Sequence, residues 1–193
     1  MTYLIVALLA YLLGSVPFGL IMARIFGLGD IRKIGSGNIG ATNVLRSGNK
    51  LAALLTLIFD AAKAGVAVLI ARSVVGEDAA GLAGLAAMLG HLYPIFLRFK
   101  GGKGVATFLG TLLALSFPVG LAACATWLAC ALITRISSLS ALVTAALAPV
   151  YTYFLYHKHG AILVLFLAAL IFYRHSVNIR RLLDGTEPKI GKK

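Results

Sequence analysis

Residues 35–46 read Gly-Ser-Gly-Asn-Ile-Gly-Ala-Thr-Asn-Val-Leu-Arg, a polar, glycine-rich loop in a chain that is otherwise mostly apolar. Glycine lets successive backbone N–H groups converge on one point, a geometry that binds anions. Hydroxyl and amide side chains and a guanidinium add donors, so the pattern indicates phosphate binding. The predicted contacts are Gly35, Ser36, Gly37, Asn38, Gly40, Thr42, Asn43 and Arg46. The alternative, a plain turn between membrane helices, explains the glycines but not the many donors.

A second glycine loop lies at residues 99–107, which read Phe-Lys-Gly-Gly-Lys-Gly-Val-Ala-Thr. It precedes another apolar run, so its backbone donors and the following helix N-terminus can face an anion. The predicted contacts are Gly101, Gly102, Lys103 and Gly104. The loop lacks the G-x-x-x-x-G-K-[ST] spacing and no strand precedes it, so nucleotide binding is not expected.

The composition is that of an integral membrane protein. Of the 193 residues, 60% are hydrophobic and the mean hydropathy is +0.95, whereas soluble domains are about 45–50% apolar. The formal net charge of +12 suits anionic lipid headgroups and an anionic substrate. No nucleic-acid-binding module is recognisable, so we expect membrane lipids and no nucleic acid as partners.

Apolar runs long enough to cross a bilayer predict an all-α, polytopic membrane protein. The expected helices cover residues 2–26, 51–71, 80–97, 141–156 and 162–173. The run 105–134 is too long for one span, and Phe117-Pro118-Val119-Gly120 divides it into two short helices, which makes seven transmembrane helices. The first helix contains Gly14-Ser15-Val16-Pro17, which predicts a kink. We expect one membrane-embedded domain over residues 1–193.

Basic residues are distributed unequally between the two predicted membrane faces. The connectors of one face carry only Arg72 and Lys158. The other face carries Arg24, Arg32, Lys33, Arg46, Lys50, Arg98, Lys100, Lys103, Arg135, Arg174, Arg180, Arg181, Lys189, Lys192 and Lys193. By the positive-inside rule this face is cytoplasmic, the N-terminus is outside and the C-terminus is inside. The polar segments therefore meet at one face, which indicates a single anion site.

Two further polar segments belong to that face. Residues 135–140 read Arg-Ile-Ser-Ser-Leu-Ser, with Arg135, Ser138 and Ser140 as candidates, although an interfacial turn is the default alternative. Residues 174–181 read Arg-His-Ser-Val-Asn-Ile-Arg-Arg. If the helix continues, His175 and Asn178 share a face that can hold an anion and a hydroxyl. An ordinary basic helix end remains the alternative there.

Charged residues also occur inside a predicted span. Asp60 and Lys63 are three residues apart on one helix face, where they can pair. Such a pair indicates either function or an anchor for helix packing, and the sequence leaves both open. His91 is a secondary candidate. The carboxylates near the loops are too few and too scattered for a magnesium site, so no metal is expected.

Residues 35–46, 90–107, 135–140 and 174–181 resemble the PlsY family of bacterial acyl-phosphate:glycerol-3-phosphate acyltransferases. The resemblance spans nearly the whole chain and implies a small seven-helix enzyme of the bacterial inner membrane, with its site at the cytoplasmic face. It implies transfer of a fatty acyl group from acyl phosphate to the 1-hydroxyl of glycerol 3-phosphate, the first step of phospholipid synthesis. The products are lysophosphatidic acid and phosphate, and a functional link to the enzyme that makes acyl phosphate is expected. Ala64 stands where the family often has glycine.

Carried over by position, the resemblance implies that the catalytic residues are Ser36, Arg46, Lys103, His175 and Asn178. Ser138 belongs to the third motif, and Ser140 is not distinguished from it. Acyl phosphate is an activated mixed anhydride, so no cofactor and no covalent acyl-enzyme are needed. His175 is a candidate general base, but the resemblance favours substrate-assisted chemistry with His175 as a binding residue. The rival hypothesis is a transporter or channel for organic phosphates, which a one-sided site and the lack of an evident repeat disfavour.

Overall fold

The computed structural model describes residues 1–191, and every regular element in this range is a helix. The α-helices of this range are α1 (Thr2–Gly14), α2 (Phe18–Ile25), α3 (Ala41–Arg46), α4 (Lys50–Val74), α5 (Glu77–Leu92), α6 (Val105–Leu115), α7 (Phe117–Thr134), α8 (Ser137–Leu155), α9 (Lys158–Arg174) and α10 (Ser176–Leu183). Short 3₁₀ turns lie at η1 (Ile31–Lys33) and η2 (Ile95–Leu97). The predicted all-α fold is confirmed. Lys192 and Lys193, used in the topology prediction, lie outside the described residues.

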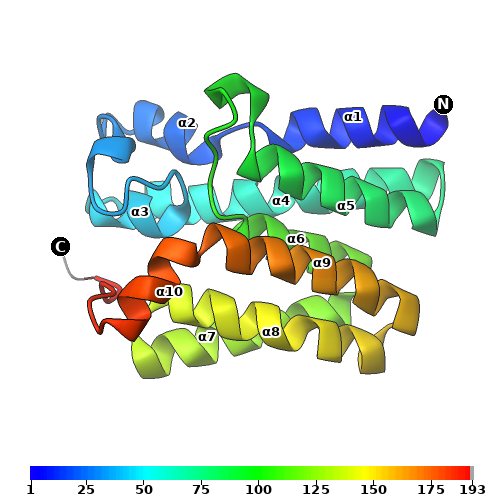
Figure 1. The fold of residues 1–193 in the computed structure, drawn as a ribbon. Coiled ribbons are helices and arrows are strands. Elements are labelled where there is room, and N and C mark those ends of the chain that lie inside the picture. The colour runs from blue at the N-terminus through cyan, green and yellow to red at the C-terminus, as the bar shows by residue number, and fades with distance from the viewer. Residues whose placement is uncertain (192–193) are drawn as a thin grey trace.

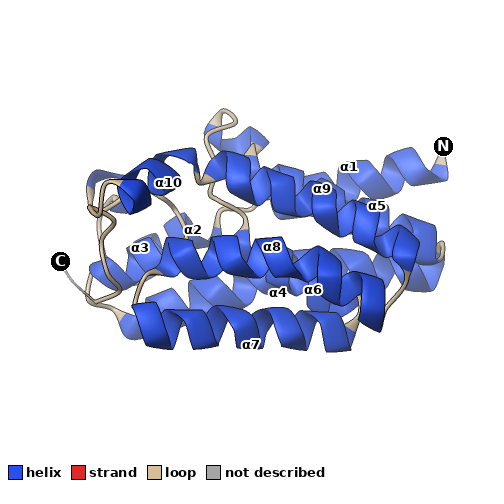
Figure 2. Ribbon diagram, turned by 60° about the horizontal axis from the view of Figure 1, so that its bottom comes forward, coloured by secondary structure: helices blue, strands red, loops and turns tan. Residues whose placement is uncertain are grey.

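The long helices lie side by side in two groups (Figure 1). Helices α1, α4 and α5 pack together, as do α7, α8 and α9, and α6 lies between α4 and α7. The N-terminus is at one end of the bundle, and α2, α3, α10 and the C-terminal tail are at the other (Figures 1 and 2). Segments far apart in the sequence therefore meet at the end that carries α3 and α10.

Glycines allow the N-terminal helices to approach closely. A Cβ atom built on Gly14 of α1 would lie 2.1 Å from the Ala87 carbonyl oxygen of α5, and one on Gly110 of α6 would lie 2.1 Å from that of Ala61 on α4. Large apolar side chains such as Leu8, Leu132 and Phe154 are exposed instead. Small residues between helices and large apolar residues outside are typical of a membrane bundle.

Five helical stretches are long and apolar enough to cross a membrane by length and composition: Thr2–Ile25, Lys50–Val74, Glu77–Leu97, Phe117–Thr134 and Ser137–Leu155. The pair Gly160–Arg174 and Ser176–Leu183 gives a sixth if the two helices, bent by 64°, count as one span. Helix α6 has 11 residues, whereas a full crossing needs about 20. The count of seven spans and the orientation of the termini stay predictions.

Both predicted helix breaks lie near a proline, but one of them begins earlier than expected. The first span breaks as predicted, because α1 ends at Gly14 and α2 begins after Pro17. The break in 105–134 falls earlier than predicted, at Ser116 alone. Pro118 lies in the first turn of α7, where its missing N–H would have had no helical partner. Proline therefore starts this helix rather than interrupting it.

Candidate active site

A cavity of about 540 Å³ opens among the polar segments at the α3 and α10 end of the bundle. Its lining joins polar residues from the loops and short helices to apolar side chains from α4, α6 and α7. The apolar part includes Leu54, Leu57, Leu109, Trp127 and Leu128. One cavity thus offers both cations and an apolar wall, which suits an amphiphilic ligand with a charged head.

The first glycine loop is organised around the buried side chain of Asn43. Its Nδ2 donates to the Ile31 carbonyl at 2.7 Å, and its Oδ1 accepts from the Ser36 N–H at 3.0 Å. Gly35 has φ +53°, and a Cβ atom there would lie 2.5 Å from Asn43 Oδ1. The Gly37 N–H donates to the Ile34 carbonyl at 2.9 Å. Two amides of the predicted anion nest, those of Ser36 and Gly37, are therefore already engaged within the loop.

The second glycine loop is fixed from two sides. The Gly102 N–H donates to the His91 carbonyl at 3.1 Å, while Arg174 donates to the carbonyls of Gly101 and Gly102 at 3.0 and 3.1 Å. A Cβ atom on Gly102 would lie 2.2 Å from His91 Nε2. These glycines let the loop pass close to His91, and this path sets the position of Lys103.

Lys103 reaches the cavity from this loop and donates a hydrogen bond to Asn178 Oδ1. Burial, together with the nearby charges of Arg181, Arg46 and Arg174, lowers the pKa of Lys103 to about 8, and the charge of Glu187 opposes this shift. The ammonium group is thus held among other cations. A bound dianion would relieve this repulsion, as expected for a phosphate site.

His175 and Asn178 line the cavity from the junction of α9 and α10. The helix does not continue through His175 as the prediction assumed, because the axis bends by 64° there. His175 Nδ1 lies 2.8 Å from the Ile171 carbonyl, which can only accept, so Nδ1 carries the hydrogen. The neutral ring then has Nε2 as an acceptor, which suits a hydroxyl donor.

The two candidate serines of residues 135–140 lie in different environments. Ser138 lines the cavity, whereas Ser140 donates to the Ile136 carbonyl at 2.9 Å within its own helix. Ser137, which the prediction missed, also lines the cavity and its hydroxyl lies 3.1 Å from that of Thr42. Arg135 is not in the lining, and its carbonyl accepts from the Ile190 N–H at 2.6 Å. Arg135 therefore holds the C-terminal tail through its backbone.

The predicted site residues divide into two sets. The cavity is lined by Ser36, Asn38, Gly40, Thr42, Asn43, Arg46, Lys103, Gly104, Ser138, His175 and Asn178. The lining does not include Gly35, Gly37, Gly101, Gly102, Arg135 or Ser140. It also contains Asp60 of the predicted intramembrane pair and His91, the secondary candidate. Three further lining residues are Trp127, Arg181 and Glu187, of which only Arg181 lies in a motif singled out by sequence. Neither Trp127 nor Glu187 belongs to a pattern that would have revealed it.

Asp60 and Lys63 do pair, and the network extends to α5 and to the break between α1 and α2. Lys63 Nζ lies 2.7 Å from Asp60 Oδ1, 2.9 Å from His91 Nδ1 and 2.9 Å from the Val16 carbonyl freed by the α1–α2 break. Both side chains of the pair are buried. The network joins the first helix break to the residue that supports the Lys103 loop.

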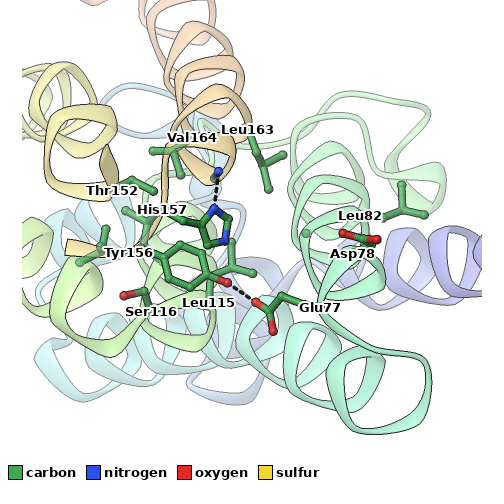
Figure 3. A pocket seen from close by; sticks show the side chains of 14 residues that line it. Glu77, Asp78, Leu82, Leu115, Ser116, Thr152, Tyr156, His157, Leu163 and Val164 are labelled. Carbon is green, nitrogen blue, oxygen red and sulfur yellow. Dashed lines mark hydrogen bonds between the residues drawn. The ribbon is translucent and has the colours of Figure 1, made fainter. Parts of the chain in front are cut away.

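A smaller cavity of about 310 Å³ lies at the opposite end of the bundle (Figure 3). There the Tyr156 hydroxyl donates to Glu77, which also pairs with Arg72 at 2.7 Å, and the Gly160 N–H donates to His157 Nδ1 at 2.8 Å. These contacts bind helix ends together. Among the side chains that the structure describes, which do not include that of His159, no group of three or more His, Cys, Asp or Glu could hold a metal ion.

Comparison with known proteins places this arrangement in a family. The family model for glycerol-3-phosphate acyltransferase matches residues 4–185. A glycerol-3-phosphate acyltransferase of Jannaschia sp. (strain CCS1) is 65% identical to this chain, over 96% of this chain and 92% of the relative. One of Cereibacter sphaeroides (strain ATCC 17025 / ATH 2.4.3) is 63% identical, over 98% of this chain and 90% of the relative. Crystal structures of PlsY, an integral membrane glycerol 3-phosphate acyltransferase, match with 40% identity over 99% of this chain and 96% of theirs. The TM-scores are 0.93 for the glycerol 3-phosphate form and 0.92 for the lysophosphatidic acid form. The chain is a multi-pass membrane protein and belongs to the glycerol-3-phosphate acyltransferase family.

Proposed function

We propose that this enzyme transfers a fatty acyl group from acyl phosphate to the 1-hydroxyl of glycerol 3-phosphate, giving lysophosphatidic acid and phosphate. The observation that carries the proposal is the mixed lining of the large cavity. Arg46, Lys103 and Arg181 supply charge for phosphates, while Leu54 and Trp127 supply apolar surface for an acyl chain. The relatives are named for acyl transfer to glycerol 3-phosphate, and PlsY has forms named for the acceptor and for lysophosphatidic acid.

Catalysis then depends mainly on positioning. The phosphate of acyl phosphate is a good leaving group, so cations that hold two phosphates side by side place the acceptor hydroxyl against the acyl carbonyl. In our proposal Ser36, Arg46 and Lys103 bind phosphate, and His175 and Asn178 orient the glycerol moiety. The hydroxyl oxygen bonds to the acyl carbon, the bond from that carbon to the phosphate oxygen breaks, and the departing phosphate takes the proton. No covalent acyl-enzyme and no cofactor enter this scheme.

We place the reaction at the cytoplasmic face of the bacterial inner membrane. Of the predicted cytoplasmic cations, Arg46, Lys103 and Arg181 line the large cavity. Arg72 lies near the end of α4 and Lys158 at the start of α9, at the other end of the bundle. Acyl phosphate must be supplied by a separate reaction, so the proposal includes a functional link to the enzyme that makes it. The alternative of a phosphate transporter is set aside because the family is one of acyltransferases.

The deciding experiment gives the purified, detergent-solubilised protein palmitoyl phosphate with and without glycerol 3-phosphate. We expect phosphate release that requires glycerol 3-phosphate and is matched by lysophosphatidic acid. Release without the acceptor would show hydrolysis instead. A folded protein that turns over acyl-coenzyme A but not acyl phosphate would replace the proposed donor, and one that turns over neither would overturn the proposal.

A further inference from the structure

Glu187 is a carboxylate in the large cavity that no motif identified. It lies in the tail after α10 and contacts two predicted site residues. Its Oε1 accepts from Ser138 Oγ at 2.7 Å and from Asn178 Nδ2 at 2.6 Å. Its Oε2 is buried and has no hydrogen-bond partner in the part of the chain whose side chains are described. A buried oxygen of this kind normally has a partner, and because Glu187 lines the cavity, a molecule bound there can supply the donor.

The tail that carries Glu187 is fixed on both sides of it. The Thr186 N–H donates to the Arg181 carbonyl at 2.8 Å, and the Ile190 N–H donates to the Arg135 carbonyl at 2.6 Å. Gly185, with φ +69°, turns the chain back after α10. The position of the carboxylate is therefore set by the backbone as well as by Ser138 and Asn178.

The chemistry of glycerol 3-phosphate limits what Oε2 can contact. An ionised carboxylate only accepts hydrogen bonds, and it repels a phosphate dianion. Lys103, Arg46 and Arg181 line the same cavity and suit the phosphate. The donors of glycerol 3-phosphate are its two hydroxyls. The 1-hydroxyl loses its proton in the reaction, and a carboxylate is a weak base, so the 2-hydroxyl, which keeps its proton, fits Oε2 better.

We propose that Glu187 Oε2 accepts a hydrogen bond from the 2-hydroxyl of glycerol 3-phosphate. This contact makes the enzyme selective for an acceptor that carries a second hydroxyl on the carbon next to the reacting 1-hydroxyl. The proposal rests on the proposed function. Glu187 also orients Asn178, because it takes the amide Nδ2 and leaves Oδ1 toward Lys103. Glu187 would thus join the recognition of the hydroxyl to the placement of the phosphate-binding lysine.

The test compares glycerol 3-phosphate with 3-hydroxypropyl phosphate, which keeps the phosphate and the reacting primary hydroxyl but lacks the 2-hydroxyl. Both are measured with the wild type, with Glu187→Gln, and with Asp184→Asn, which removes an exposed carboxylate of the same tail. Glutamine can still accept from Ser138 and Asn178 but places NH₂ where Oε2 was. We expect wild type and Asp184→Asn to prefer glycerol 3-phosphate by about 10- to 100-fold in kcat/KM, the range for a hydrogen bond to a charged group. In Glu187→Gln the preference should fall toward one, through loss of activity on glycerol 3-phosphate alone.

Two results would overturn the proposal. If Glu187→Gln lowers KM for both phosphates, the carboxylate occupies a phosphate position and leaves when substrate binds. If kcat falls equally for both, Glu187 acts on the reacting hydroxyl or on the fold. Equilibrium binding of the two phosphates gives the same comparison without turnover. Binding that shows the selectivity and loses it in Glu187→Gln, in a protein that does not transfer acyl groups, would overturn the proposed function and leave the hydroxyl contact standing.

Discussion

Lys103 is the residue whose contribution is simplest to isolate. Its ammonium group lines the cavity, whereas Lys100 in the same loop is exposed and outside the lining. Removing one phosphate counter-charge should lower kcat/KM of Lys103→Ala by about 10²- to 10³-fold, with the protein still folded. Lys100→Ala is the matched control and should stay within about twofold of wild type. Equal losses in both variants would mean that general charge, and not this position, attracts the substrate.

The pKa of Lys103 also predicts a pH dependence. At about 8, this pKa leaves the side chain charged below pH 8 and neutral above it. A phosphate monoester has its second pKa at about 6, so the substrate keeps its charge between pH 7 and pH 9. We therefore expect kcat/KM for glycerol 3-phosphate to fall about tenfold between pH 7 and pH 9. Lys103→Arg, which stays charged, should remove the fall, and a fall that persists there would belong to another group.

Helix α6 depends on glycine where it crosses α4. Gly110 approaches the Ala61 carbonyl so closely that a Cβ atom would lie at 2.1 Å, whereas a Cβ atom on Gly65 of α4 would lie 3.4 Å from the nearest atom, the Gly110 carbonyl oxygen. Gly110→Ala should force the helices apart and destabilise the protein by about 1–3 kcal/mol. Gly65→Ala, at the same interface, should leave the thermal unfolding temperature in detergent unchanged or raise it. Similar losses in both would show that the α4–α6 contact is looser than described.

Individual elements show where prediction from sequence succeeds. The break at Ser15-Val16-Pro17 was predictable because proline and glycine act locally on the backbone. The exact end of α6 was not predictable, because proline is also common in the first turn of a helix, where Pro118 lies. The 64° bend at His175 was not predicted, because no glycine or proline marks it in residues 171–181.

The sequence predicts that four polar segments meet at one site, which is the large cavity. It does not predict which residues of these segments line the cavity. Several glycines serve contacts with Asn43 or His91 instead of lining the cavity. The hydrogen bond from Ser140 to the carbonyl of Ile136, four residues earlier, cannot be recognised in a serine-rich segment. Glu187 is one carboxylate in a tail, and only the fold brings it to Ser138 and Asn178. Composition and motifs therefore locate a site, while tertiary contacts assign its members.

The orientation of the whole bundle is testable by cysteine labelling. In a variant with both native cysteines replaced by alanine, Lys189→Cys lies at the cavity end and Asp78→Cys at the opposite end, and both positions are exposed. We expect a membrane-impermeant maleimide to label position 78 in bacteria whose outer membrane has been made permeable, and position 189 only in inverted inner-membrane vesicles. The reverse pattern would place the site outside the cytoplasm.

The tail contact between Ile190 and Arg135, together with the contacts of Glu187, has a consequence for how the enzyme comes into being. The cavity wall begins at Ser36 and closes only with residues 187–190, so almost the entire polypeptide must leave the ribosome before the wall is complete. N-terminal helices insert and pair during synthesis. A prematurely terminated chain that ends after α8 can therefore form helices yet lacks His175, Asn178 and the tail. A partly synthesised copy of the enzyme is therefore inactive until its C-terminal residues have been added.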